Sequence, residues 1–153
     1  MKKSQTYTNS EYGFSVNYPA DWDVREDIDG LVVAFDGPTV LEGIYDVNIN
    51  VNAERIDEKM TLGDYVVASD LKAIDTIPNY KKVKEYTAKI NGLEATVLEA
   101  TLAVKCNGKK VDLKNKYAIV IKDKVAYTIA YDTPAESHDE YVDCFDLVIN
   151  SFK

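Results

Sequence analysis

Residues 117–131 read YAIVIKDKVAYTIAY and contain two alternating segments joined by a short polar turn. In the second segment one face carries the large side chains of Val125, Tyr127, Ile129 and Tyr131. The opposite face carries Ala126, Thr128 and Ala130. A turn as short as Lys122-Asp123-Lys124 cannot hold the long crossover that parallel strands need, so the two strands must be antiparallel. Because both faces can be covered, the sequence predicts a central antiparallel sheet with helices on both sides.

Strand patterns extend through most of the remaining chain. They predict strands at 13–18, 31–37, 47–54, 80–90, 94–106, 111–122 and 124–131. Asn-Gly pairs at 91–92 and 107–108 are typical of hairpin turns. In VNINVNAE, residues 47–54, apolar residues alternate with asparagines, which predicts one buried and one wet face. The fold class is therefore predicted as α+β, an α/β/α sandwich on a central antiparallel sheet, with residues 1–153 forming one domain.

A helix is predicted over 61–76, because Thr61 is a good N-cap and the helix should stop before Pro78. Leu62, Val66, Ala73 and Ile77 can face the sheet. Val67, Leu71 and Ile74 form a second apolar stripe that points away from it. We expect an intramolecular cover for this second stripe, from a loop at 37–46 that carries Val40, Leu41 and Ile44. The alternative is an exposed patch that binds a partner.

A closing helix is predicted over 136–150, with two different faces. Its apolar stripe consists of Tyr141, Cys144, Phe145, Val148 and Phe152. Its acidic stripe consists of Glu136, Asp139, Glu140 and Asp143. Carboxylates in the first turn are favoured by the helix dipole.

The charge and the length of apolar runs exclude several functions. The formal net charge is −8, and a nucleic-acid binder needs a basic stripe that this chain lacks. No run approaches the roughly 20 apolar residues of a membrane span. The N-terminal segment MKKSQTYTNS has the basic start of an export signal without its apolar region. Either the protein is cytoplasmic, or its export segment is absent from this chain.

Candidate catalytic and metal-binding residues are few, so we expect no catalytic site, metal site or cofactor. His138 is the one histidine, and we expect it on the surface rather than beside a nucleophile. Cys106 and Cys144 are expected to be structural thiols, with one long-range disulfide as the alternative. The acidic stretch 21–30 is expected to be a solvated loop, although clustered carboxylates also suit calcium. Trp22 is expected to plug the core near one end of the sheet.

The segment EYGFSVNYPADWDV, residues 11–24, resembles the opening of the PsbP-like family. The matching positions are Tyr12, Gly13, Phe14, Tyr18, Pro19 and Trp22, and further matches are Asn91-Gly92, the strand at 127–131, and Ile149, Ser151 and Phe152. The family shares its fold with the Ran-binding Mog-type proteins and with small exported lipoproteins. The resemblance implies an α/β/α sandwich and a role in binding or assembly rather than catalysis. It favours an exported or membrane-tethered protein.

Three functional interpretations remain. The first is a non-enzymatic module that binds an unidentified protein partner through Val67, Leu71 and Ile74. The second is a carrier that holds a small molecule or metal ion between sheet and helix. The third, a hydrolase, is disfavoured because no nucleophile stands near a base in the sequence. No pattern in the sequence indicates an oligomeric state.

Overall fold

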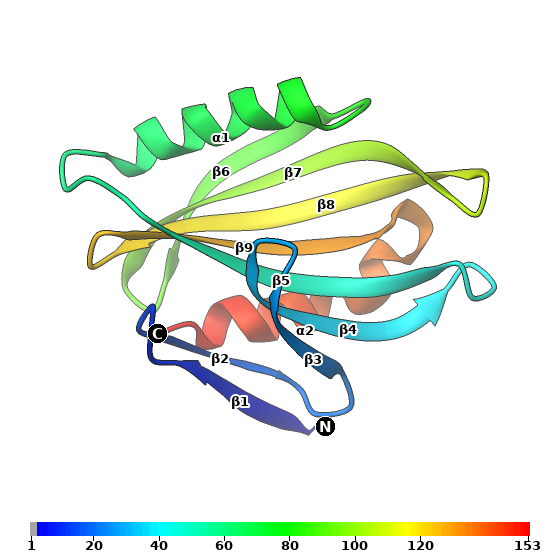
Figure 1. Ribbon diagram of the computed structural model, residues 1–153, viewed down its shortest axis with the longest axis horizontal. Helices are drawn as coiled ribbons and strands as arrows, with labels where there is room; N and C mark the ends of the chain where they lie inside the picture. Colours follow the sequence, from blue (N-terminus) through cyan, green and yellow to red (C-terminus); the bar gives the residue numbers. More distant parts are fainter. Residues whose placement is uncertain (1–2) are drawn as a thin grey trace.

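The computed structural model describes residues 3–153 and is shown in Figure 1. Met1 and Lys2, the start of the segment considered above as an export signal, lie outside the described residues. The strands are β1 (Ser4–Asn9), β2 (Phe14–Pro19), β3 (Asp23–Ile28), β4 (Leu31–Val40), β5 (Tyr45–Arg55), β6 (Lys81–Ile90), β7 (Leu93–Cys106), β8 (Lys109–Lys122) and β9 (Val125–Pro134). The helices are α1 (Leu62–Thr76), the short 3₁₀ turn η1 (Ala135–Ser137) and α2 (His138–Ser151).

Seven strands form the central sheet in the order β3-β4-β5-β9-β8-β7-β6. All neighbouring pairs are antiparallel, which confirms the predicted sheet. Strands β6 to β9 form a meander of consecutive hairpins, whereas β5 pairs with β9, so that Asn48 lies opposite Asp132. Strands β1 and β2 form a separate two-stranded sheet.

One face of the central sheet is covered by α2 and the β1-β2 hairpin (Figure 1). The main core lies here, and Phe145, Val148 and Phe152 of the closing segment are fully buried in it. Phe152 contacts the rings of Phe14 and Tyr127 at centroid distances of 6.0 and 5.0 Å. The predicted apolar stripe of the closing helix is therefore its core face.

Trp22 belongs to this core, as predicted, and is 6% exposed. It follows the turn that ends β2 and packs against Gly37 of β4. Strand β3 begins directly after it. The predicted acidic loop at 21–30 is wrong, because Asp23–Ile28 form an edge strand paired with β4. The run of charged residues in Asp23–Ile28 lacks the alternation typical of a strand. Edge strands, however, tolerate charged residues on both faces.

The opposite face is partly covered by α1, which crosses above β6, β7 and β8 in Figure 1. The helix begins as predicted: Thr61 Oγ1 accepts the amide of Asp64 at 3.1 Å, and Asp64 Oδ2 accepts the amide of Thr61 at 3.3 Å. This reciprocal pair satisfies two amides at the helix start. Only Tyr65 and Val66 of α1 are buried, and they pack on a small second core with Leu98 and Ile119.

Candidate functional site: the outer face of α1 and the cleft beneath it

Three large apolar side chains face solvent on the outer side of α1. Val67, Leu71 and Ile74 are 60%, 64% and 64% exposed. Their spacing of four and three residues places them on one side of the helix. We call these three residues the outer stripe. Exposed apolar side chains gathered on one surface of a protein often mark an interaction site.

The predicted cover of the outer stripe is wrong. Residues 37–46 form mainly strand: β4 continues to Val40, β5 starts at Tyr45, and these two residues pair. Val40 packs against the main core on the other face of the sheet. The hairpin between β4 and β5 carries Leu41 and Ile44 away from α1, because strand pairing continues to its tip.

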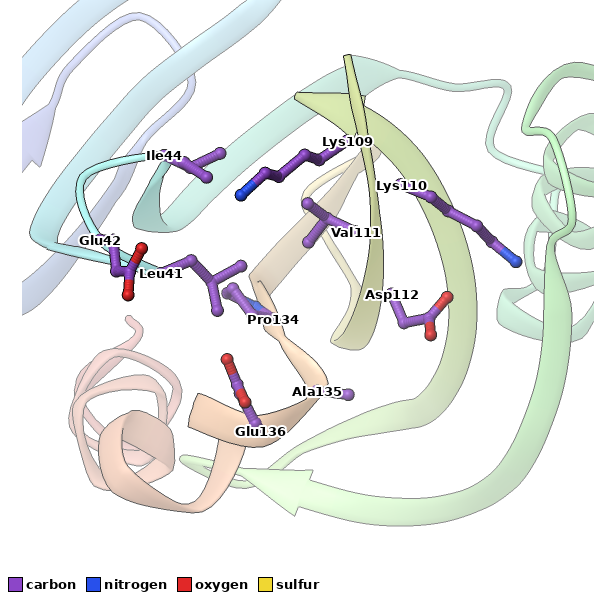
Figure 2. A pocket seen from close by; sticks show the side chains of 10 residues that line it. All are labelled: Leu41, Glu42, Ile44, Lys109, Lys110, Val111, Asp112, Pro134, Ala135 and Glu136. Carbon is purple, nitrogen blue, oxygen red and sulfur yellow. The ribbon is translucent and has the colours of Figure 1, made fainter. Parts of the chain in front are cut away.

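Leu41 and Ile44 instead line a hollow of about 510 Å³ between the β4-β5 tip, the β7-β8 tip and η1. Figure 2 shows Leu41, Val111 and Pro134 pointing toward one another inside it. Lys109, Glu42 and Glu136 add charges of both signs. Because these charges oppose one another, the hollow favours neither anions nor cations.

Three polar contacts link α1 and the segment after it to the sheet. Asp70 forms an ion pair with Lys82 of β6 at 2.8 Å. Tyr65 donates to Glu54 of β5 at 2.9 Å. Just after the helix, the hydroxyls of Tyr80 and Tyr117 lie 2.6 Å apart.

Beneath α1, on the side toward β5 and β9, two adjoining hollows of about 520 and 380 Å³ separate the helix from the sheet. Four residues line both of them: Ser69, Ala73, Ile77 and Thr128. The small side chains at positions 69 and 73 leave space that larger residues would fill. We call the combined space the α1 cleft.

A row of hydrogen-bonded polar side chains crosses the sheet beside the α1 cleft. It contains Asp36, Asn48, Asn50, Asp132 and Asn115, from strands β4, β5, β9 and β8. Asn48 Nδ2 donates to Asp36 at 2.8 Å, and Asn50 Nδ2 donates to Asn48 at 2.7 Å. The Asn115 amide donates to Asp132. The predicted wet face of β5 is therefore the middle of this polar row.

The two carboxylates of the polar row lie in different electrostatic surroundings. Burial would raise the pKa of Asp36, but hydrogen bonds from Arg25 and Asn48 outweigh burial and hold that pKa below its ordinary value. Burial raises the pKa of Asp132, and hydrogen bonds from Asn115 and Asn50 offset only part of the rise. Asp36 has a cationic partner in Arg25, whereas Asp132 has amide partners alone among the ion pairs and hydrogen bonds of residues 3–153.

His138 is buried, 5% exposed, so its predicted surface position is wrong. The first turn of α2 is held against β9, where Tyr131 donates to the His138 carbonyl at 2.7 Å and the two rings lie 5.1 Å apart. Burial lowers the pKa of His138, and Lys114 lowers it further. Within residues 3–153, His138 Nδ1 has no hydrogen-bond partner. The imidazole therefore packs between the start of α2 and Tyr131 of β9.

The other sites considered from the sequence also lie in structural positions. The carboxylates of the 21–30 stretch are spread along β3, and no group of three or more His, Cys, Asp or Glu in residues 3–153 could hold a metal ion. Cys106 is half-buried at the end of β7, and Cys144 is buried on the core face of α2. Neither described helix is long and apolar enough to span a membrane.

Comparison with known proteins decides the family. The family model described as PsbP-like protein matches residues 1–153. The chain belongs to the PsbP-like family. No curated protein sequence matches it.

Solved structures similar to this PsbP-like chain share its fold. Cyanobacterial PsbP (CyanoP) from Synechocystis sp. PCC 6803 has a TM-score of 0.71 and 17% identity, covering 100% of this chain and 93% of that one. LpqN of Mycobacterium tuberculosis, described as involved in cell envelope biogenesis, has a TM-score of 0.70 and 11% identity, with 99% and 90% covered. The Ran-binding protein Mog1p of Saccharomyces cerevisiae has a TM-score of 0.63 and 10% identity, with 100% and 96% covered.

Sequence reasoning missed the polar residues at the α1 cleft of this PsbP-like chain. Asp132, Asn115 and Tyr80 come from separate parts of the chain and meet only through the β8-β9 pairing and the return of the chain after α1. One signal was present: a polar residue that follows an alternating apolar strand, as Asp132 follows Tyr131, continues the face of Thr128 and Ala130.

Proposed function

We propose that this protein is a non-enzymatic binding or assembly module, and that the outer stripe of α1 is the surface that binds a protein partner. The exposure of Val67, Leu71 and Ile74 is the observation that carries the proposal. Leu and Ile side chains that are largely exposed to water are unfavourable in free energy, and covering them favours association.

The net charge of −8 favours a neutral or basic partner over a second copy of the same chain. Two copies repel each other, and charge complementarity decides which proteins approach. The helix itself adds to this preference, because Asp64 and Asp75 are exposed on α1 with Lys72 as the one exposed cation of the helix.

An exported or membrane-tethered location agrees with the similarity to LpqN, which is described as involved in cell envelope biogenesis. Within the proposal, the domain stands outside the cytoplasm and brings its partner to the envelope. Fractionation of cells that express the native gene would test this location. Recovery in the soluble cytoplasmic fraction would contradict it.

The binding surface is tested by Leu71→Glu, which places a charge in the centre of the outer stripe. Because Leu71 is 64% exposed, the variant should keep its fold and melting temperature. It should lose association with a partner purified from the native organism by at least tenfold in Kd, since a buried unpaired charge is costly.

The matched control is Val24→Glu, which makes the same kind of change on β3 at the opposite edge of the sheet, where Val24 is 38% exposed. It should leave partner affinity unchanged. Equal affinity in the Leu71→Glu variant would refute the assignment. Light scattering that showed a dimer broken by Leu71→Glu would identify the partner as a second copy and overturn the preference for a different protein.

A further inference from the structure

The α1 cleft holds a carboxylate that lacks a positive partner. Asp132 lines the 380 Å³ hollow together with Asn115, Tyr80 and Tyr117. Hollows of about 300–1,000 Å³ are the usual size of small-molecule sites. The remaining wall is mostly apolar. It is formed by Leu102, Ile77, Ala73 and Ala130, together with Ser69 and Thr128.

The hydrogen bonds of Asp132 leave part of its carboxylate available. Asn115 and Asn50 donate to it, while an ionised carboxylate offers about four acceptor positions. The lysines that precede and follow Asn115, Lys114 and Lys116, lie on the opposite face of β8, because successive side chains of a strand alternate. Asp132 therefore presents acceptor positions to the 380 Å³ hollow, whose lining residues include no cation.

Two tyrosines line the same hollow. The hydroxyls of Tyr80 and Tyr117 contact each other at 2.6 Å. Burial raises the pKa of both hydroxyls, so the rings stay neutral at physiological pH. Neutral aromatic rings attract cations through their faces.

The geometry points to the α1 cleft as a binding site for a small organic cation, a primary ammonium group on an apolar body, with Asp132 accepting the ammonium. The apolar body would lie against Ala73, Ile77 and Leu102. This site lies beneath the helix and is separate from the outer stripe, so it adds a second ligand to the proposed protein-binding role.

The donor set favours an organic cation over the other ligand classes. A hard metal ion such as Ca²⁺ takes six to eight oxygen ligands, and residues 3–153 contain no acidic cluster that approaches this number. An anion would meet the Asp132 carboxylate inside a protein of net charge −8. An ammonium group satisfies the carboxylate, and the acidic surface concentrates cations near the cleft.

The test compares three probes of similar shape: phenethylamine, phenethyl alcohol and hydrocinnamate. Each is titrated into the ¹⁵N-labelled full chain at pH 8, and binding is followed by the NMR signals of the Asn50 and Asn115 side-chain amides. The amine should shift these signals in a saturable way. The alcohol should bind at least tenfold more weakly, and the anion should not bind.

Two variants locate the site. Asp132→Asn removes the charge while keeping the size of the side chain, and it should reduce amine affinity at least tenfold without changing alcohol affinity. Asp112→Asn removes the same charge from an exposed position of β8 and should change neither. Ala73→Leu fills the cleft and should weaken both probes.

Three results would overturn the inference. They are amine binding no tighter than alcohol binding, unchanged amine affinity in Asp132→Asn, and the absence of saturable shifts at the two asparagines with any probe. Each variant is checked by its melting temperature and amide spectrum. Because the readout is small-molecule binding, failure here leaves the outcome of the Leu71→Glu test on partner binding unaffected.

Discussion

The indole of Trp22 lies so close to Gly37 that a Cβ atom at position 37 would stand 2.6 Å from the ring. Trp22 is buried and surrounded by the main core, so the ring cannot move aside freely. Gly37→Ala should therefore destabilise the protein by about 1–3 kcal/mol, the usual cost of overfilling a core. Urea unfolding followed by Trp22 fluorescence measures it.

Gly63→Ala is the control for this change. A Cβ at position 63 meets only Thr61 Oγ1, at 3.9 Å, and position 63 lies inside α1. Alanine is the better helix former, so this variant should gain up to about 0.5–1 kcal/mol. Equal loss in both variants would mean that the contact with Trp22 is not the cause.

The two faces of α2 should respond very differently to substitution. Phe145 is fully buried and stacks on Tyr131 at a centroid distance of 5.8 Å. Phe145→Ala should cost about 3–5 kcal/mol in the free energy of unfolding. Asp143→Asn, on the exposed acidic stripe, should change it by less than about 1 kcal/mol. Similar effects in calorimetry would reverse our assignment of the faces.

The N-cap residue of α1, Thr61, should contribute to the free energy of unfolding. Thr61→Ala removes the side-chain acceptor of the Asp64 amide and should cost about 1 kcal/mol. Thr61→Ser keeps the acceptor and is the matched control. A variant with alanine that unfolds at the same urea concentration as the serine variant would show that the cap contributes nothing.

The pH dependence of stability should report the carboxylate of Asp132. Its pKa in the folded state is raised by burial above the value in the unfolded chain, so the folded state binds the proton more tightly. Ionising this buried carboxylate therefore destabilises the folded protein. The destabilisation is absent below the pKa of the unfolded chain and develops as the pH rises through the pKa of the folded state. Asp132→Asn should therefore raise the melting temperature at pH 7 relative to wild type, and the gain should shrink toward pH 4.

The matched control for the pH experiment is Asp36→Asn, whose wild-type carboxylate has a pKa lowered by Arg25 and Asn48. The pH dependence of stability due to Asp36 therefore has the opposite sign to that of Asp132. The stabilising contribution of Asp36 is present above the unfolded pKa and is lost as the pH falls through the lowered value, so Asp36→Asn should destabilise at pH 7. A gain in both variants would contradict the different surroundings of the two carboxylates.

Local sequence signals were sufficient for strands β4 to β9 of the central sheet and for both helices. Thr61 and Pro78 bounded α1 to within a residue of its observed ends, because capping and proline sterics act locally. The exposure of the outer stripe could not be predicted from local sequence. Helical spacing identifies which residues share a face, but what covers that face depends on where the distant β4-β5 hairpin goes. His138 was misplaced for the same reason, since its burial comes from Tyr131 on a neighbouring element.

Polar strands were the other source of error. In β1 only Tyr7 is buried, so its alternation is too weak to stand out, and β3 is charged along its length. Predicting the α1 cleft would also have required the register between strands, because that register brings its residues together. The alternation in 47–54 predicted a wet face but not that Asn50 would meet Asp132.

The pairing of β5 with β9 has a consequence for how the molecule folds. Asn48 and Asp132 face each other across 84 positions of chain, the difference of 132 and 48, whereas β6 to β9 are joined by short hairpins. Closing the long loop costs more chain entropy than forming the hairpins, so we expect the meander to form before β5 pairs with β9. The polar row is divided between these two parts. In this order Asn115 and Asp132 take their places with the meander, and Asn48 and Asn50 join them when β5 pairs with β9. We therefore expect the polar row beside the α1 cleft to be completed in the step that completes the sheet.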